Sequence, residues 1–336
     1  MEVTGSHDLE DMMRVYTSWR ELAEIGSRIG LSKAKEEQYM EVSPTKIIIV
    51  GIGGSGIIGD FLKGLSEHYQ FTTDINVTKN ITISNYLSKD SMVVVISYSG
   101  DTVETIKALE SIKGRPIKLV GVTSGGLLEK ILEKENATIL KLPGGYPSRG
   151  AFPLMFYSVL SYLSYLRLTG KLSIDEITNS TKILENTDAT MKNAWNISEA
   201  INKDKLFITT HHEYMPIASR LKKELSENAK VLAIAEEYPE WLHNTLEGIR
   251  VDDFNIVSIV GNLTSSYKCF MEATEKVLNT NIIKINLIGK SLLEEYIYGT
   301  WLSGFISLVI AQRKNVNPRL TSRLSFYRKI VSRECI

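Results

Sequence analysis

The sequence predicts an α/β protein with two doubly wound parallel sheets, each an α-β-α sandwich. Short runs rich in valine and isoleucine at 46–50 and 92–96 stop at glycine or serine, just before segments with helical spacing. Such runs are typical of parallel strands covered by helices on both faces. The alternation resumes after residue 200. The length of 336 residues favours two domains, since single cores stop growing at about 250–300 residues.

The first domain is expected at 41–175, after a helical lead-in at 1–40 whose apolar residues have the spacing of an amphipathic helix. Polar, punctuated sequence at 170–188 marks the boundary. Besides the two strong strands, the patterns predict strands at 117–122 and 138–142 and helices at 56–68, 103–112, 127–133 and 154–168.

The second domain is expected at 185–336. An amphipathic helix is predicted at 216–228, and two further helices are predicted near the C-terminus, separated near 315–318. The predicted strands of this domain lie at 205–210, 231–235, 255–260 and 282–287.

Composition excludes several classes of function. The 39 basic and 39 acidic residues cancel, so no global field favours nucleic acid or an anionic membrane. The apolar stretches 151–166 and 301–311 are shorter than the roughly 20 residues of a membrane span and are interpreted as buried helices. The polar N-terminus does not resemble a signal peptide, so a cytoplasmic protein is expected. Cys269 and Cys335 are too few for a disulfide framework.

A glycine-rich loop, Gly51-Ile-Gly-Gly-Ser-Gly56, directly follows the first strong strand. Glycines there allow backbone amides to approach an anion at a helix N-terminus. Three interpretations stay open at this point. The loop could bind a phosphate, it could be a simple strand-to-helix turn, or it could bind a dinucleotide with Asp74 on the ribose.

A second loop favours the phosphate interpretation. Ser97, Ser99 and Thr102 follow the strand at 92–96 and open the next helix. Hydroxyl and amide donors without lysine or magnesium suit a phosphate that is held but not transferred. One hydroxyl would be enough to cap the helix, so a cluster of three indicates a binding site.

Together these loops resemble the phosphosugar-binding signatures of the sugar-isomerase (SIS) domain, which implies phosphate binding by Gly53, Gly54 and Ser55 as well as by the three hydroxyls. Downstream segments resemble the bifunctional phosphoglucose/phosphomannose isomerase family in order and spacing. They are the arginine segment at 147–151, the glutamate segment at 226–230 and the histidine segment at 242–244.

The reaction implied by this resemblance needs residues of these types. Moving a proton between C1 and C2 of an open sugar through an enediolate requires one base, and the resemblance assigns Glu227 to that role. His243 would open the sugar ring. Arg149 would stabilise negative charge on the enediolate. Without the resemblance, Glu227 would be interpreted as a solvated carboxylate at a helix end.

The sequence departs from the family in the last helix. An ungapped count from Pro318 places Arg328 where the family has a lysine near the ring oxygen. We assign that role to Lys329, because lysine exchanges a proton and arginine does not, although one position turns a helix by about 100°. Thr321 matches a threonine that the family associates with accepting mannose phosphate.

The sequence therefore predicts an isomerase that interconverts glucose 6-phosphate, and also mannose 6-phosphate, with fructose 6-phosphate. The resemblance implies no cofactor and no metal, and a homodimer whose active sites are shared between subunits. The alternative is a regulatory SIS protein that senses a phosphosugar without chemistry. It would keep the hydroxyl cluster and could dispense with the glutamate, histidine and arginine.

Overall fold

The computed structural model describes residues 6–37, 44–83 and 87–334. These residues form two compact units, each discontinuous in sequence. The first-sheet unit comprises Ser18–Lys182 and the described residues from Ser322 onward. The second-sheet unit comprises the described residues up to Thr17 and Ile183–Thr321. Cys335 lies outside the described residues, and Cys269 is an exposed free thiol.

The first-sheet unit contains a five-stranded parallel sheet in the order β2-β1-β3-β4-β5. Its strands are β1 Lys46–Val50, β2 Asp74–Thr78, β3 Ser91–Ile96, β4 Lys118–Thr123 and β5 Thr138–Lys141. Its helices are α2 Trp19–Glu36, α3 Gly53–His68, α4 Val103–Glu110, α5 Gly126–Lys134, α6 Phe152–Tyr165, α7 Ile174–Ser180 and α13 Ser322–Glu334. The short turn η1, Thr181–Leu184, spans the boundary between the two units in the sequence.

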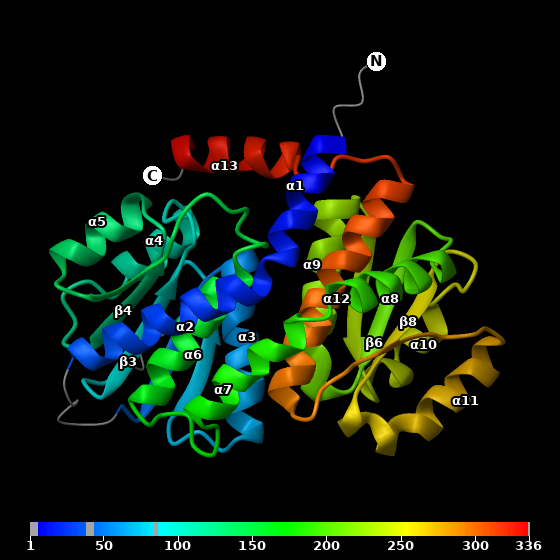
Figure 1. Cartoon of the computed structure of the whole chain (residues 1–336), viewed down its shortest axis with the longest axis horizontal. Helices are drawn as coiled ribbons and strands as arrows, with labels where there is room; N and C mark the ends of the chain where they lie inside the picture. Colours follow the sequence, from blue (N-terminus) through cyan, green and yellow to red (C-terminus); the bar gives the residue numbers. More distant parts are fainter. Residues whose placement is uncertain (1–5, 38–43, 84–86, 335–336) are drawn as a thin grey trace. The chain divides into compact units, whose positions relative to one another are not determined.

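Helices cover both faces of this sheet (Figure 1). Val93 and Val95 of β3 pack with α4 and α5 on one face. The neighbouring residues along the strand are buried on the opposite face, where α3 and α6 lie and α2 packs against α6. All six residues of β3 are buried, which explains its continuous apolar sequence.

Helices α2 and α6 approach each other closely. A Cβ atom on Gly30 would lie 2.2 Å from the carbonyl oxygen of Ser158, and one on Gly26 would lie 2.7 Å from that of Leu154. Trp19 stacks on Phe152 at the same interface, with 5.7 Å between ring centroids. The predicted lead-in helix is thus two helices, α1 Ser6–Thr17 and α2, which belong to different units.

The second-sheet unit contains a four-stranded parallel sheet in the order β7-β6-β8-β9. Its strands are β6 Lys205–Thr210, β7 Leu232–Glu237, β8 Asn255–Val260 and β9 Ile283–Asn286. Besides α1, its helices are α8 Thr187–Ala200, α9 Met215–Glu224, α10 Thr245–Gly248, α11 Lys268–Leu278 and α12 Leu292–Arg313. Its short turns are η2 His212–Tyr214, η3 Leu225–Ala229, η4 Glu240–His243 and η5 Asn262–Tyr267.

The second sheet also lies between two layers. Helices α8, α9 and α12 pack together on one side, and α1 packs against α12. On the other side, Phe207 and Ile256 of the sheet pack against Trp241 of η4 and Met271 of α11. Helix α12, which contains the apolar stretch 301–311, is buried along almost its whole length. Both units therefore have the doubly wound architecture that the sequence predicts.

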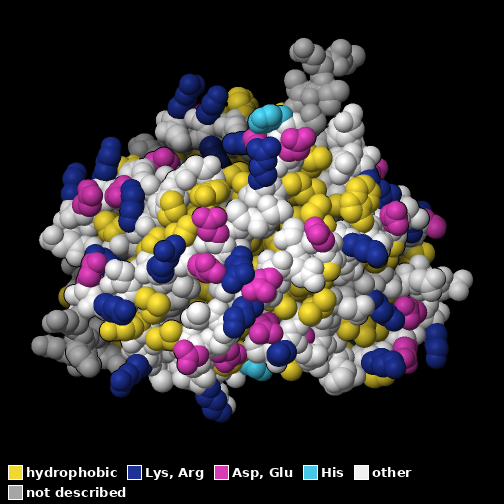
Figure 2. All heavy atoms as spheres, viewed as in Figure 1, with side chains coloured by type: hydrophobic (Ala, Val, Ile, Leu, Met, Phe, Trp, Pro, Cys, Tyr) yellow, Lys and Arg dark blue, Asp and Glu magenta, His cyan; other side chains and the backbone are white. Residues whose placement is uncertain are grey.

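Charged side chains of both signs are mixed on the surface. Figure 2 shows basic and acidic side chains interspersed over the face in view, in line with a net charge of zero. Within the described ranges, every helix is too short or too polar to cross a bilayer.

Candidate functional site

The candidate site begins where the order of the first sheet reverses. Strands β1 and β3 are neighbours, and their connections leave in opposite directions along the sheet, to β2 and to β4. The loops after Val50 and Ile96 therefore start side by side at the carboxyl edge. Doubly wound sheets bind ligands at this point.

The first loop leads into α3, which begins at Gly53. Gly53 has a φ of 61°, and apart from its chain neighbours and the backbone of its own helix no described atom lies within 4 Å of the place that a Cβ would take. Ser55 is buried, and its hydroxyl accepts a hydrogen bond from the Tyr98 amide at 3.3 Å and donates to Met155 Sδ at 3.7 Å. Ser55 thus joins the two loops to each other and to α6.

The second loop contains the three predicted hydroxyls. Ser97 donates a hydrogen bond to Thr102 Oγ1 at 3.0 Å. Thr102 is the residue that caps α4, yet its side chain makes no capping hydrogen bond. The Asp101 amide donates to Ser99 Oγ at 3.4 Å. The hydroxyl of Thr102 is therefore not used to satisfy the helix N-terminus, in contrast to the simple capping role considered for this cluster.

The arginine segment lies against the first loop. A Cβ on Gly54 would be 3.2 Å from Ser148 Oγ and 3.7 Å from the Arg149 amide. Arg149 is only 8% exposed. The first-sheet unit thus brings together three of the predicted elements: the glycine loop, the hydroxyl loop and the buried guanidinium.

Tyr98, which the sequence did not single out, fixes the loop that leads into the arginine segment. Its hydroxyl donates to the Pro143 carbonyl at 2.8 Å and accepts from the Tyr146 amide at 3.2 Å. Burial raises the pKa of this phenol, and the hydrogen bond from Tyr146 offsets part of that rise. The sequence signal for this role is an aromatic residue inside a loop of otherwise small and polar residues.

The C-terminal helix α13 lies next to the first turn of α4. Tyr327 donates a hydrogen bond from its hydroxyl to Glu104 Oε1 at 3.2 Å, across 223 positions of sequence. Arg328 and Lys329 follow directly and are both exposed. Helix α13 thus brings two cations to the unit that holds the hydroxyl loop.

The other predicted site residues belong to the second-sheet unit. Glu227 is half-buried in the π-helical turn η3, which directly follows α9. His243 is exposed at the end of η4, and Thr321 is half-buried at the end of the unit.

The equivalent edge of the second sheet is filled by side chains of its own unit. Glu295, from α12, accepts hydrogen bonds from the Asn262 amide at 2.8 Å and from the Tyr214 hydroxyl at 2.6 Å. The Leu263 amide donates to the same Tyr214 hydroxyl at 3.1 Å. Burial and the hydrogen bond to Glu295 raise the pKa of Tyr214. The amides at this edge are thus satisfied internally.

His211 and His212, which directly follow β6, are paired with carboxylates. His211 contacts Glu213, and His212 Nδ1 lies 2.7 Å from Glu237 Oε2. Burial lowers the pKa of His211, and the charge of Glu213 partly opposes this shift.

The dinucleotide alternative fails on the position of Asp74. That interpretation requires the acidic residue near the carboxyl edge, beside the glycine loop. Asp74 instead begins β2, in register with Lys46 at the start of β1. It lies at the amino edge of the sheet, about 13 Å from the loop at 3.3 Å per residue.

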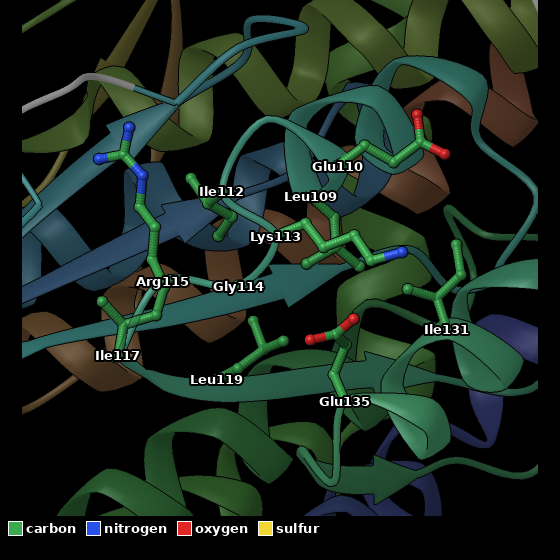
Figure 3. A pocket seen from close by; sticks show the side chains of 10 residues that line it. All are labelled: Leu109, Glu110, Ile112, Lys113, Gly114, Arg115, Ile117, Leu119, Ile131 and Glu135. Atoms are coloured by element: carbon green, nitrogen blue, oxygen red, sulfur yellow. The ribbon is translucent and has the colours of Figure 1, made fainter.

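A cavity of about 130 Å³ in the first-sheet unit also lies away from the loops. It is formed by the end of α4, the following turn, the start of β4 and the end of α5, and Lys113 and Glu135 enter it from opposite sides (Figure 3). The hydroxyl loop is at the other end of α4. The cavity is therefore no part of the candidate site.

The two units match models of SIS domains. A model of the SIS domain matches residues 42–165, and a model of the bacterial phospho-glucose isomerase C-terminal SIS domain matches residues 190–331. Two doubly wound units that match SIS-domain models define a double-SIS protein. Among solved structures, a hypothetical protein from Thermus thermophilus superposes with a TM-score of 0.73 at 15% identity, covering 97% of this chain and 94% of that one. The tagatose-6-phosphate ketose/aldose isomerase of Escherichia coli superposes with a TM-score of 0.70 at 15% identity, covering 93% of both chains.

Curated relatives extend over most of the chain. The bifunctional phosphoglucose/phosphomannose isomerase of Aquifex aeolicus is 28% identical over 302 residues, which cover 84% of this chain and 89% of the relative. The enzyme of that name from Thermoplasma acidophilum is 26% identical over 294 residues, or 86% and 90%. The D-glucosamine-6-phosphate 4-epimerase of Sulfolobus acidocaldarius is 29% identical over 314 residues, or 91% and 93%. This chain thus contains two SIS domains and is similar over most of its length to bifunctional phosphoglucose/phosphomannose isomerases.

Proposed function

We propose that this enzyme interconverts glucose 6-phosphate and mannose 6-phosphate with fructose 6-phosphate through an enediolate. One observation carries the proposal: the Ser97 and Thr102 hydroxyls meet at the start of α4 without capping it. The first-sheet unit also holds a buried arginine beside the glycine loop. An anionic sugar with a phosphate at one end suits both features.

The phosphate would be held by the amides of Gly53, Gly54 and Ser55 and by the hydroxyls of Ser97, Ser99 and Thr102. Such donors at a helix start stabilise a dianion without being consumed in the reaction. The Ser55 hydroxyl bonds to Tyr98 and Met155, and the Ser55 amide donates to the Ile52 carbonyl at 3.2 Å. Of these two groups we assign the donor role to the amide, which would exchange the Ile52 carbonyl for the phosphate.

His243 and Lys329 would open the ring by moving a proton between the ring oxygen and the C1 hydroxyl. Glu227 would then take the C2 proton of the open aldose, while the C–H electrons form the C1–C2 double bond and the carbonyl oxygen becomes an enediolate oxygen. Returning that proton to C1, while the hydroxyl proton on O2 passes to O1 and C2 becomes the carbonyl carbon, leaves the ketose. Arg149 would stabilise the enediolate oxygens, since a fixed cation lowers the energy of charge that develops in the transition state.

We further propose that the enzyme acts as a dimer and that His243 serves the neighbouring subunit's site. This proposal rests on the family resemblance. The exposure of His243 on a short turn is compatible with that role. Size-exclusion chromatography with light scattering tests the dimer. Mixing Glu227→Gln and His243→Ala subunits tests sharing, because mixed dimers would regain one intact site.

A second candidate is epimerisation at C4 of an amino-sugar phosphate. One observation favours it: the alignment with the Sulfolobus acidocaldarius epimerase covers 91% of this chain at 29% identity. A single experiment separates the two. The enzyme is incubated in deuterium oxide that contains a chelator. The substrates are the 6-phosphates of glucose, mannose, fructose and glucosamine, each tested separately, and the products are identified by NMR.

The proposed isomerase gives ketose and aldose products with deuterium at C1 or C2. The chelator should not change the rate, because the reaction needs only proton transfer. A C4 epimer of glucosamine 6-phosphate without label at C1 or C2 would establish the second candidate. Binding of the sugars without any turnover would support the regulatory alternative instead of an enzyme.

A further inference from the structure

Glu227 stands on an unusual piece of backbone. Helix α9 ends at Glu224 and continues into the π-helical turn η3, in which the Lys230 amide donates to the Leu225 carbonyl five residues earlier. Lys230 then adopts a left-handed conformation, with φ 57° and ψ 34°. π-turns are rare and occur frequently at functional sites. The chain therefore needs a specific reason to hold this turn.

A buried polar network lies along the inner side of this segment. Arg220, Glu224 and Asn228 are spaced four residues apart, and none is more than 1% exposed. Arg220 forms an ion pair with Glu224. Asn228 Nδ2 donates to Glu224 Oε2 at 2.7 Å. The network thus crosses the junction between α9 and η3 and ends on the residue next to Glu227.

Two neighbouring helices anchor the network. Tyr16 of α1 donates a hydrogen bond to Glu224 Oε2 at 2.6 Å. Asn228 also donates to Ser307 Oγ of α12 at 2.9 Å. The two anchors are fully buried. The network is therefore attached to α1 at Glu224, directly before the turn, and to α12 at Asn228, which directly follows Glu227 in the turn.

The outer side of the turn is attached as well. Lys230 Nζ donates to the Glu227 carbonyl at 2.5 Å and to the Leu320 carbonyl at 2.6 Å. The main chain of Glu227 is thus fixed from both sides, while its side chain stays half-buried. A base that must reach both C1 and C2 needs such fixed geometry, since a misplacement of about 1 Å costs up to a hundredfold in rate.

Stability alone is a poor reason for this network. A protein in which well-packed apolar residues replace a buried ion pair is often as stable as the original protein, or more stable. Buried polar groups do, in some proteins, select one conformation among several. A π-turn, which competes with a regular helix, is a conformation that needs such selection.

We propose that Asn228, Glu224 and Tyr16 are positioning residues that hold the π-helical turn in the shape that presents the Glu227 carboxylate. The inference rests on the proposed role of Glu227 as the base. None of the three is expected to touch the substrate. Their loss should therefore act on turnover and leave phosphate binding, which we assign to the first-sheet unit, unchanged.

The test measures kcat, KM and melting temperature for Asn228→Ala, Ser307→Ala and Tyr16→Phe. Asn228→Ala should lower kcat by about tenfold or more with KM within about twofold of wild type, because only the geometry of the base changes. The other two variants remove one anchor each and should give smaller losses of kcat. They keep the test usable if Asn228→Ala does not fold.

Tyr157→Phe is the matched control for Tyr16→Phe. It also removes a fully buried tyrosine hydroxyl, which bonds to Ser180 at 2.7 Å in the first-sheet unit. It should lower the melting temperature by a similar amount and leave kcat unchanged. Equal melting-temperature losses with unchanged kcat in every network variant would overturn the proposal and leave a structural network.

Failure of this inference is distinguishable from failure of the proposed function. If wild type does not isomerise hexose 6-phosphates, or Glu227→Gln keeps full turnover, the proposed function is wrong. If wild type is active and Glu227→Gln is not, but the network variants retain kcat, only the positioning role is wrong.

Discussion

The Ser97 hydroxyl donates a hydrogen bond to Thr102 Oγ1 at 3.0 Å, and the Thr102 side chain does not cap the helix that it precedes. Two hydroxyls at a helix start that bond to each other can both turn toward a ligand. Capping hydroxyls, by contrast, are held by backbone amides. This relationship favours the proposed phosphate loop over an ordinary helix start.

Replacing both Ser97 and Thr102 by alanine should therefore raise KM for hexose 6-phosphate by about tenfold or more, because hydrogen bonds to a charged group contribute roughly 1.5–3 kcal/mol each. Steady-state kinetics measure the effect. Ser173→Ala is the control, since Ser173 does cap its helix by accepting from the Glu176 amide at 3.1 Å. It should lower stability and leave KM alone. An unchanged KM in the double variant would rule out the phosphate loop.

Glu227→Gln keeps the shape of the side chain and removes the base. Turnover should fall by about 10² to 10⁴-fold while KM changes little, as expected for the loss of a general base. Exchange of solvent deuterium into the product should disappear in parallel. Glu213→Gln is a suitable control, because Glu213 belongs to the second-sheet unit but pairs with His211. If Glu227→Gln kept more than about a tenth of wild-type turnover and still exchanged deuterium, another residue would be the base.

Lys329 and Arg328 can be separated by single substitutions. The two side chains leave α13 about 100° apart, so only one of them can point to a given site. Lys329→Gln should lower kcat on the ring form of the substrate, whereas Arg328→Gln should retain it. A substrate that is already in the open form does not need ring opening, so the loss of kcat in Lys329→Gln should be smaller with that substrate. The reverse ranking of the two variants would move the assignment to Arg328.

The filled edge of the second sheet predicts one phosphosugar per chain. Glu295 and Tyr214 already accept hydrogen bonds from the amides of Asn262 and Leu263. Titration calorimetry with glucitol 6-phosphate, which lacks the carbonyl group and does not react, should give a stoichiometry near one. Binding should be lost in the Ser97→Ala, Thr102→Ala double variant. Two equivalent sites per chain would contradict this account of the second unit.

Glu37 should contribute to stability in a pH-dependent manner. Burial raises the pKa of this carboxyl, but hydrogen bonds from Thr138, Tyr162 and Lys118 outweigh burial and lower it from 4.5. A carboxyl whose pKa is lower in the folded state than in the unfolded state stabilises the protein when the pH is above the unfolded-state pKa. This stabilisation is lost as the pH falls through the folded-state pKa. Glu37→Gln should therefore lower unfolding free energy at neutral pH by roughly 1–3 kcal/mol.

The measurement is denaturant unfolding between pH 3 and 7, an interval chosen to span the ordinary carboxyl pKa of about 4.3. The difference between wild type and Glu37→Gln should narrow toward the acid end. Glu36→Gln provides the control, since Glu36 is exposed and pairs only locally with Lys33. A difference that is constant with pH would show that Glu37 acts through packing instead of through its charge.

The limits of sequence-based prediction are visible at particular elements. Strands β1, β6 and β8 have the predicted bounds, because each is a short, buried run with clear ends. Strand β2 was not predicted. Its sequence Asp-Ile-Asn-Val-Thr alternates polar and apolar residues at the edge of the sheet, so it lacks the continuous apolar run of a central strand. The break between α1 and α2 and the π-turn after α9 were also missed.

The sequence by itself determined the two doubly wound domains, the two loops at the edge of the first sheet and, through resemblance, the residue types of the site. These features depend on local patterns of apolar residues, glycines and hydroxyls. Only the tertiary structure decided that Thr102 does not cap its helix, that Tyr98 fixes the loop that leads into the arginine segment, and that Glu295 fills the second edge. Such contacts join residues that are far apart in the chain; Tyr16 and Glu224, for example, are 208 positions apart. The packing of buried helices selects these partners, so they cannot be predicted from local sequence patterns.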